Sequence, residues 1–104
     1  MKKIYLFSYL ILFFSNSLIA QADSVMKLGL EVYNNKAQCG VCHILQTAGS
    51  EGQIGPNLDQ LKPQVGQIIS AVTNGIGVMP AFEGILTVEE IEAVAYYVSK
   101  STNK

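Results

Sequence analysis

The sequence predicts an all-α fold, made of about four short helices in a single small domain. Apolar residues recur with helical spacing in several segments, and glycine-rich loops separate those segments. No run of alternating apolar and polar residues is long enough to predict a strand. The chain has 104 residues, which is room for one domain at most, and its formal net charge of −1 offers no basic surface for a nucleic acid.

The N-terminus has the three parts of a secretory signal peptide. Two lysines precede an apolar stretch over residues 4–14, and an Ala-Gln-Ala sequence ending at Ala22 is a small-x-small cleavage site. An uncleaved membrane anchor is the alternative, but spanning a bilayer takes about 20 apolar residues, more than this stretch provides. We therefore expect residues 1–22 to be a signal peptide removed after Ala22. Residues 23–104 would then be the exported domain, periplasmic and without stable membrane insertion.

The exported domain would have a small core and an acidic balance. Because two lysines leave with the signal, five lysines would remain against eight carboxylates, and the formal charge would fall from −1 to −3. A domain of this size often needs a disulfide, a metal or a cofactor to be stable. The size of the domain therefore favours a fold that a disulfide, a metal or a cofactor helps to stabilise.

The first helix is predicted over residues 24–34. Its apolar positions follow helical spacing and are Val25, Leu28 and Val32. Gly29 lies inside this helix, where glycine costs about 1 kcal/mol relative to alanine. Either the helix is simply imperfect there, or the glycine allows the last helix, with Tyr96 and Tyr97, to cross it closely.

Two further helices are predicted in the middle of the chain. Residues 39–46 form a candidate short helix, which would end in a polar loop. Pro63 suits the first position of the next helix, because the N–H that it lacks would have no partner there. Asn74 and Gly75 form a stop signal for that helix. Its apolar positions are Val65, Ile68, Ile69 and Val72.

The last helix has the clearest start. Thr87 and Glu90 form a capping box, in which each side chain accepts a hydrogen bond from the other residue's backbone N–H. Leu86 and Ile91 occupy the two positions of the hydrophobic staple that flanks such a box. The apolar stripe of this helix consists of Ile91, Val94, Ala95 and Val98, with Tyr97 beside it.

The motif with chemical content is Cys39-Gly40-Val41-Cys42-His43. A Cys-x-x-Cys-His sequence is typical of c-type haem attachment. Two thiols three positions apart can reach the vinyl groups on neighbouring pyrroles, and the histidine that follows can bind the iron. The motif predicts one covalent haem c, held by Cys39 and Cys42, with its iron bound by His43.

Three other interpretations of this motif remain open. A structural disulfide is possible in an oxidising compartment, but it gives no role to His43. A thioredoxin-like redox pair would be surrounded by a βαβ pattern, which the sequence lacks. A zinc site takes about four ligands, and Cys39, Cys42 and His43 are the only cysteine and histidine residues in the chain.

The sixth position of the iron needs a second ligand from elsewhere, since His43 is the only histidine. Methionine, lysine, water or no ligand are the choices. Met26 lies in the first predicted helix, whereas Met79 lies in a loop with two glycines and Pro80. The glycines permit tight turns and the proline fixes φ, so this loop can hold a weak thioether ligand in place. Met79 is the candidate ligand, with ordinary core packing as the alternative.

With its other motifs included, the exported domain resembles a small bacterial class I cytochrome c over nearly its whole length. The matching elements, in chain order, are Gly29 and Tyr33, Cys39–His43, Gly55–Leu58, Met79–Phe82 and Tyr96–Val98. The resemblance implies the small cytochrome c fold, with its helices wrapped round one covalent haem. It implies that the carbonyl of Pro56 accepts the Nδ1 proton of His43, and that Leu58 and Phe82 line the haem pocket.

The resemblance further implies a one-electron carrier and not an enzyme. Iron with two protein ligands has no open position for a substrate, and His–Met ligation raises its reduction potential. The partners would be redox proteins, donor and acceptor, and the chain would be a monomer or a subunit of a redox complex. An electron-accepting subunit of a periplasmic dehydrogenase or oxidase is one alternative function. A five-coordinate haem sensor or enzyme is the other, and it requires Met79 not to bind. The basic docking ring of some family members has no counterpart here.

Overall fold

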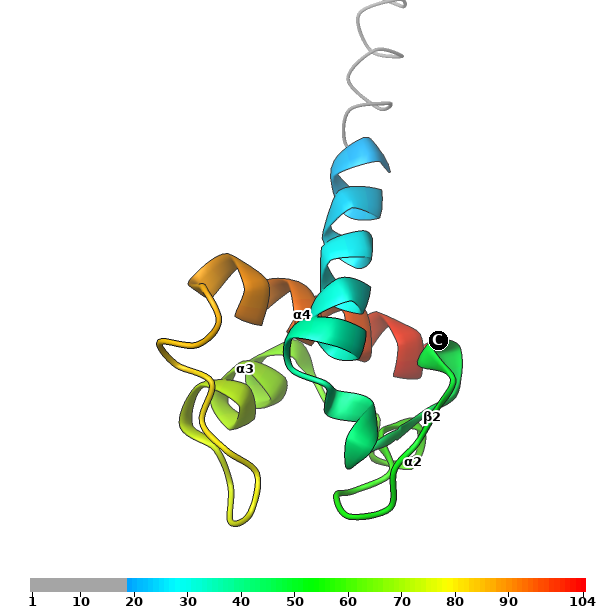
Figure 1. Ribbon diagram of the computed structural model, residues 1–104. Coiled ribbons are helices and arrows are strands. Elements are labelled where there is room, and N and C mark those ends of the chain that lie inside the picture. The colour runs from blue at the N-terminus through cyan, green and yellow to red at the C-terminus, as the bar shows by residue number, and fades with distance from the viewer. Residues whose placement is uncertain (1–18) are drawn as a thin grey trace, which may run out of the picture.

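The computed structural model describes residues 19–104, so most of the predicted signal peptide, residues 1–18, lies outside the described residues. The described part is mainly helical, which confirms the predicted all-α class. Figure 1 shows the helices packed together, with loops that project on the side away from the N-terminal helix. Within residues 19–104, no helix combines the length and the apolar character needed to cross a membrane.

The N-terminal helix is described over residues 19–31 and continues into the π-helical turn η1 (Val32–Lys36). The helix predicted over residues 24–34 therefore lies inside a longer helical segment. The predicted cleavage point after Ala22 also falls within it. Val32 and Tyr33 are fully buried, so the C-terminal end of this segment enters the core.

The short helix predicted over residues 39–46 is wrong beyond its first turn. The observed elements are the 3₁₀ turn η2 (Cys39–Val41), strand β1 (Ile44–Leu45), the 3₁₀ turn η3 (Gln46–Ala48) and strand β2 (Ser50–Glu51). The strands pair antiparallel, with Leu45 opposite Ser50. Leu45 is fully buried in this hairpin, so its burial outweighs the local helical tendency. A Cβ on Gly40 would lie 2.6 Å from the Cβ of Ser50, which shows that the hairpin packs directly on η2.

Helix α2 (Leu58–Leu61) is a single turn that the sequence analysis missed. The side chain of Asn57 caps it by accepting a hydrogen bond from the N–H of Gln60 at 3.2 Å. Lys62 ends it in the left-handed conformation, with φ of 50°. An apolar periodicity cannot reveal so short an element.

Helix α3 (Val65–Asn74) ends as predicted, with Gly75 at a φ of 74°. Its predicted start at Pro63 is two residues too early, because Gln64 is still extended, with φ of −81° and ψ of 157°. Pro63 is buried in the turn that leads into the helix. Its carbonyl oxygen accepts a hydrogen bond of 3.0 Å from the side-chain amide of Asn103, which ties this turn to the C-terminus.

Helix α4 (Val88–Thr102) begins at the predicted capping box. The hydroxyl of Thr87 accepts from the N–H of Glu90 at 3.1 Å, and Glu90 accepts from the N–H of Thr87 at 3.0 Å. The two predicted staple residues, Leu86 and Ile91, are both buried. The N-terminal start of α4 is therefore confirmed in detail.

The N-terminal helix crosses α4 at Gly29 (Figure 1). A Cβ on Gly29 would lie 2.4 Å from both the carbonyl oxygen of Ala93 and the Cβ of Tyr97. The rings of Tyr33 and Tyr97 pack beside this crossing, with centroids 6.1 Å apart. The close-packing interpretation of Gly29 is confirmed, and α4 packs against α3 as well.

Candidate functional site

A single cavity of about 510 Å³ collects the residues that the sequence analysis selected. Seven predicted site residues line it: Cys39, Cys42, His43, Pro56, Leu58, Met79 and Phe82. Two walls come from helices, with Ile68 and Val72 on α3 and Val94 and Val98 on α4. The loops that close it are those on the lower side of Figure 1, after β2 and after α3. None of the residues that line this cavity is charged.

His43 is held in a defined orientation by three hydrogen bonds. Its Nδ1 lies 2.7 Å from the carbonyl oxygen of Pro56. Because a carbonyl only accepts, Nδ1 carries the proton and Nε2 keeps the lone pair that a metal needs. The N–H of His43 donates to the carbonyl of Cys39 at 3.0 Å, and its own carbonyl accepts from the hydroxyl of Ser50 at 3.0 Å.

Gly55 provides the space in which the imidazole of His43 lies. A Cβ at this position would be 2.5 Å from Cε1 and 2.9 Å from Nδ1 of the ring. Any side chain larger than that of glycine would therefore push the ring away from the carbonyl of Pro56. The N–H of Gly55 donates to the carbonyl of Cys42 at 2.7 Å, which fixes the loop against the motif.

Ser50 and Tyr33 form a second support for His43, one that the sequence analysis did not identify. The hydroxyl groups of Tyr33 and Ser50 lie 2.8 Å apart. Because Ser50 donates its proton to His43, Tyr33 is the donor in this pair. Burial raises the pKa of Tyr33 to about 12, so the phenol keeps its proton at neutral pH. No sequence motif could have identified Ser50. It reaches His43 only because the hairpin of β1 and β2 folds back on the motif, and the sequence did not predict that hairpin.

Both cysteines are free thiols, so the structure shows no disulfide between them. Burial raises the pKa of the Cys39 thiol to about 11. The free thiol is therefore protonated at neutral pH. Cys39 begins the turn η2 and Cys42 caps its end, and both line the cavity beside His43.

Met79 is carried by a tight turn between α3 and α4. Ile76 and Met79 exchange backbone hydrogen bonds of 3.1 and 2.9 Å, with Gly77 at a φ of 56° between them. A Cβ on Gly75 would lie 2.7 Å from the carbonyl oxygen of Met79. The N–H of Phe82 donates to the carbonyl of Val72 at 2.8 Å, which anchors the end of the turn on α3. The glycines thus allow the turn to fold back and bring Met79 to the same cavity as His43.

The cavity fits a covalently attached porphyrin. Two thiols, an imidazole with an available Nε2 and a thioether line one space, and that space lies within the roughly 300–1,000 Å³ of ligand sites. The remaining lining side chains are apolar or neutral, as a flat, mainly apolar ring requires. The donor set and the shape therefore suit haem c.

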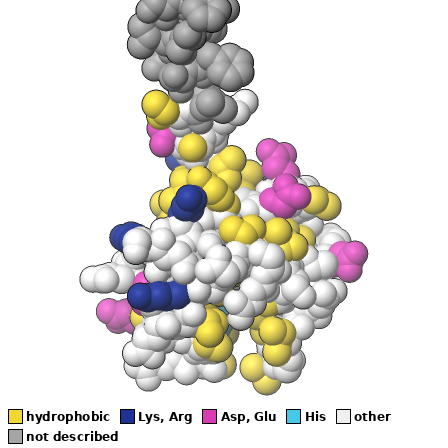
Figure 2. Space-filling model, turned by 180° about the vertical axis from the view of Figure 1, so that it is seen from behind, with side chains coloured by type: hydrophobic (Ala, Val, Ile, Leu, Met, Phe, Trp, Pro, Cys, Tyr) yellow, Lys and Arg dark blue, Asp and Glu magenta, His cyan; other side chains and the backbone are white. Residues whose placement is uncertain are grey.

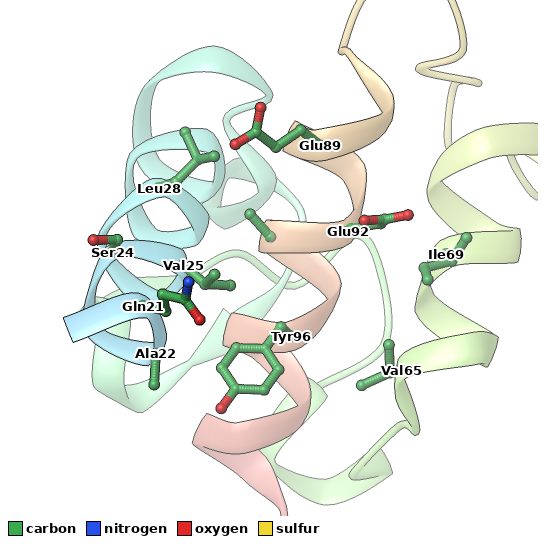
Figure 3. Close-up of a pocket in the computed structure, with 11 residues that line it drawn as sticks. Gln21, Ala22, Ser24, Val25, Leu28, Val65, Ile69, Glu89, Glu92 and Tyr96 are labelled. Carbon is green, nitrogen blue, oxygen red and sulfur yellow. The ribbon is translucent and has the colours of Figure 1, made fainter. Parts of the chain in front are cut away.

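A second hollow, of about 600 Å³, lies between the N-terminal helix and the outer faces of α3 and α4. Figure 3 shows Val25 and Leu28 on one side, Val65 and Ile69 on the other, and Tyr96 between them. Its lining contains no cysteine, histidine or methionine. The candidate chemistry therefore belongs to the first cavity, on the opposite faces of α3 and α4.

Comparisons of the sequence and of the structure with known proteins find the same class of protein. The family model described as cytochrome C oxidase, cbb3-type, subunit III matches residues 25–98, which include every predicted site residue. A cytochrome c6 from Leptolyngbya boryana is 36% identical over 80 residues, covering 73% of this chain and 92% of that protein. A cytochrome c6 from Microcystis aeruginosa is 51% identical over 43 residues, 41% of this chain and only 53% of that protein. The crystal structure of the c-type cytochrome SorU from Sinorhizobium meliloti superposes with a TM-score of 0.74 at 50% identity, covering 79% of this chain and 95% of that one.

Proposed function

Because this chain belongs to the monohaem c-type cytochromes, we propose that it is a periplasmic one-electron carrier whose haem iron is bound by His43 and Met79. Family membership establishes the coarser statements: the chain carries a covalent haem c with iron and takes part in electron transport. The single observation that supports the ligand pair is that His43 and Met79 line one uncharged cavity together with both cysteines.

When bound, the haem supplies an iron that alternates between two oxidation states one electron apart. The protein's own residues hold and tune that group. Cys39 and Cys42 would bind the porphyrin edge through thioether bonds, and His43 would offer Nε2 to the iron. Pro56 accepts the Nδ1 proton, which fixes the ring and makes it a stronger ligand.

The apolar walls have an electrostatic role. Leu58, Ile68 and Val72 are buried at the cavity and exclude water from it. An apolar surrounding disfavours the extra positive charge of the oxidised iron, and a methionine ligand raises the potential in the same direction. We therefore propose that this site favours the reduced state more than an exposed haem would.

The signal peptide and the location of the protein are part of this proposal. Residues 1–22 would direct export and be removed after Ala22, leaving residues 23–104 as the periplasmic domain. The N-terminal sequence pattern of two lysines, an apolar stretch and a small-x-small site supports it. N-terminal sequencing of the protein purified from the periplasm tests the cleavage point, and a start other than Asp23 would contradict it.

The alternative function is that of an electron-accepting subunit in a periplasmic dehydrogenase or oxidase complex. The description of the matched family as an oxidase subunit favours it, since the same domain can serve in a fixed complex. Native gel filtration of the protein from its own periplasm separates the two: a monomeric mass supports the free carrier, and co-elution with a larger enzyme supports the subunit.

The main proposal is tested by spectroscopy of the protein made with a haem-attachment system. A pyridine haemochrome spectrum of haem c, in a one-to-one ratio with protein, is expected. The oxidised protein should show the weak far-red band of methionine-bound iron, and a redox titration should follow a one-electron curve. High-spin features in place of that band would favour the five-coordinate sensor or enzyme, and colourless protein would refute the proposal.

A further inference from the structure

The hollow of about 600 Å³ on the side of α3 and α4 away from the haem cavity has the form of a groove between helices. Tyr96 of α4 lies at its floor (Figure 3). One wall is the N-terminal helix, with Val25 and Leu28, and the other is α3, with Val65 and Ile69. We name this hollow the outer groove. Its volume lies within the roughly 300–1,000 Å³ that is usual for ligand sites.

The walls of the outer groove are apolar and partly exposed. Val25 and Leu28 are three residues apart, and Val65 and Ile69 are four apart, so each pair lies on one face of its helix. Val25 and Val65 are each 37% exposed. Figure 2 shows apolar side chains gathered at the foot of the N-terminal helix, with acidic side chains beside them. Contiguous apolar surface of this kind is typical of an interaction site.

The edge of the outer groove carries negative charge. Glu89 and Glu92 line it from α4, three residues apart, and both are exposed. Within residues 19–104 neither carboxylate belongs to an ion pair. No lysine lines the groove. The ammonium of Lys100 lies 5.6 Å from the centre of the Tyr96 ring, but its Cα is about 12 Å along the helix from that of Glu92. The groove therefore offers two apolar walls and an acidic edge to the same occupant.

We infer that the outer groove binds an amphipathic helix of a partner protein, with its apolar stripe between the two walls and lysines or arginines against Glu89 and Glu92. The charge complementarity selects a basic occupant. The helical walls select a helix, because their backbone N–H and C=O groups are already paired within each helix and cannot add a strand. A helix in an apolar groove is a common form of peptide recognition, with anchors spaced three or four residues apart.

This inference goes beyond the proposed function, since α3 and α4 present their other faces to the haem cavity. A helix in the outer groove would hold the cytochrome in a complex and leave the haem cavity uncovered. The proposed cleavage after Ala22 preserves the site. It removes only Gln21 and Ala22 from the lining, while both apolar walls and the acidic edge remain.

A synthetic peptide of about four helical turns is the probe, with leucines at positions i, i+3, i+4 and i+7 and lysines beside them. Added to the reduced, haem-bound domain of residues 23–104, it should shift the methyl NMR signals of Val25, Val65 and Ile69. The methyl signal of Met79, which lines the haem cavity, should stay unchanged. A peptide with glutamates in place of the lysines should bind at least about tenfold more weakly at low ionic strength.

Charge reversal in the protein gives the matched test. The double variant Glu89→Lys/Glu92→Lys should weaken binding of the lysine peptide by about tenfold or more at low ionic strength. The control Glu51→Lys/Glu83→Lys makes the same change in net charge at two exposed residues outside the groove lining, so it should weaken binding much less. Glu92→Lys alone, beyond the first turn of α4, repeats the test if reversal at Glu89 disturbs the start of that helix.

The apolar walls are tested separately. Val65→Ser should weaken peptide binding about threefold, because the serine removes apolar surface from one wall. Val88→Ser is the control, since Val88 is 72% exposed and does not line the groove. Equal effects of the two serine variants would contradict the role of the walls.

The other outcomes also decide the inference. Equal effects of the two charge reversals, or peptide-induced shifts centred on Met79 and not on the groove, would overturn it. Shifts of Val65 and Ile69 that follow the protein concentration without any peptide would identify a second copy of the chain as the occupant, and would also overturn it. Peptide binding does not depend on the iron ligands, so a spectrum without the methionine band would overturn the proposed ligand pair and leave this inference standing.

Discussion

Gly29 and Tyr97 touch where the N-terminal helix crosses α4: a Cβ on Gly29 would stand 2.4 Å from the Cβ of Tyr97. Gly29→Ala is therefore expected to force the two helices apart. Overpacking of this kind costs about 1–3 kcal/mol, and the gain in helix propensity of about 1 kcal/mol offsets only part of it. Denaturant unfolding of the haem-bound protein should show a lower midpoint with an unchanged slope.

The matched control is Gly66→Ala on α3. Outside its chain neighbours and the adjacent backbone of α3, no atom lies within 4 Å of a Cβ built there. Alanine should therefore stabilise the helix by up to about 1 kcal/mol. If both substitutions destabilised the protein equally, close packing at Gly29 would not be the reason for its glycine.

The sequence predicted those helix starts and stops that depend only on residues close together in the chain. The capping box at Thr87 needs only residues three apart, and the stop at Gly75 needs only a positive φ, so both appear in the sequence pattern. The crossing at Gly29 was open between two interpretations, because only the packed structure shows which residue lies opposite the glycine.

The elements that the sequence could not predict depend on contacts between distant residues. The hairpin of β1 and β2 exists because Leu45 is buried and Ser50 reaches the carbonyl of His43, neither of which has a periodic signature. More of the candidate site than of the surrounding fold could be predicted from the sequence. The site residues belong to short motifs, and the glycines and prolines within those motifs form the turns that position them.

The Lys36–Glu90 ion pair predicts a loss of stability in acid. Hydrogen bonds from the Lys36 ammonium first, and from the N–H of Thr87 second, hold the pKa of Glu90 below its usual value. A carboxylate whose pKa is lower in the folded state stabilises the fold above its unfolded pKa of about 4.3, and this contribution is lost as the pH falls through the folded value. The difference in unfolding free energy between the parent and Glu90→Gln should therefore be constant near neutral pH and shrink below about pH 4.

The partner of Glu90 supplies the control for this prediction. In a Lys36→Met background, the difference caused by Glu90→Gln should be smaller at every pH above about 5. An unchanged difference would show that the N–H of Thr87, and not the ammonium of Lys36, is the main cause of the lowered pKa.

The Tyr33–Ser50–His43 chain of hydrogen bonds predicts strong coupling between its first two members. Ser50→Ala would leave the phenol of Tyr33, which is fully buried, without its acceptor, at a cost of about 1–3 kcal/mol. Tyr33→Phe removes the same hydrogen bond from the other side. In a double-mutant cycle followed by thermal unfolding, the double variant should lose less stability than the sum of the single variants. Exact additivity would show that the hydroxyls do not interact, and Ser70→Ala on the exposed face of α3 is the control.

Met79 provides the test of the proposed iron ligand. Met79→Ala removes the only methionine that lines the cavity, so the sixth position should open. We expect the far-red band of the oxidised protein to disappear, the reduced protein to bind carbon monoxide, and the reduction potential to fall by on the order of 0.1 V, a fraction of the roughly 0.8 V that axial ligands span. Met26→Ala, in the half-buried part of the N-terminal helix, is the control and should lose stability while keeping the band and the potential. A Met79→Ala protein that titrates like the parent and excludes carbon monoxide would show that another group binds the iron. In that case Met79 would be a packing residue of the loop that carries it.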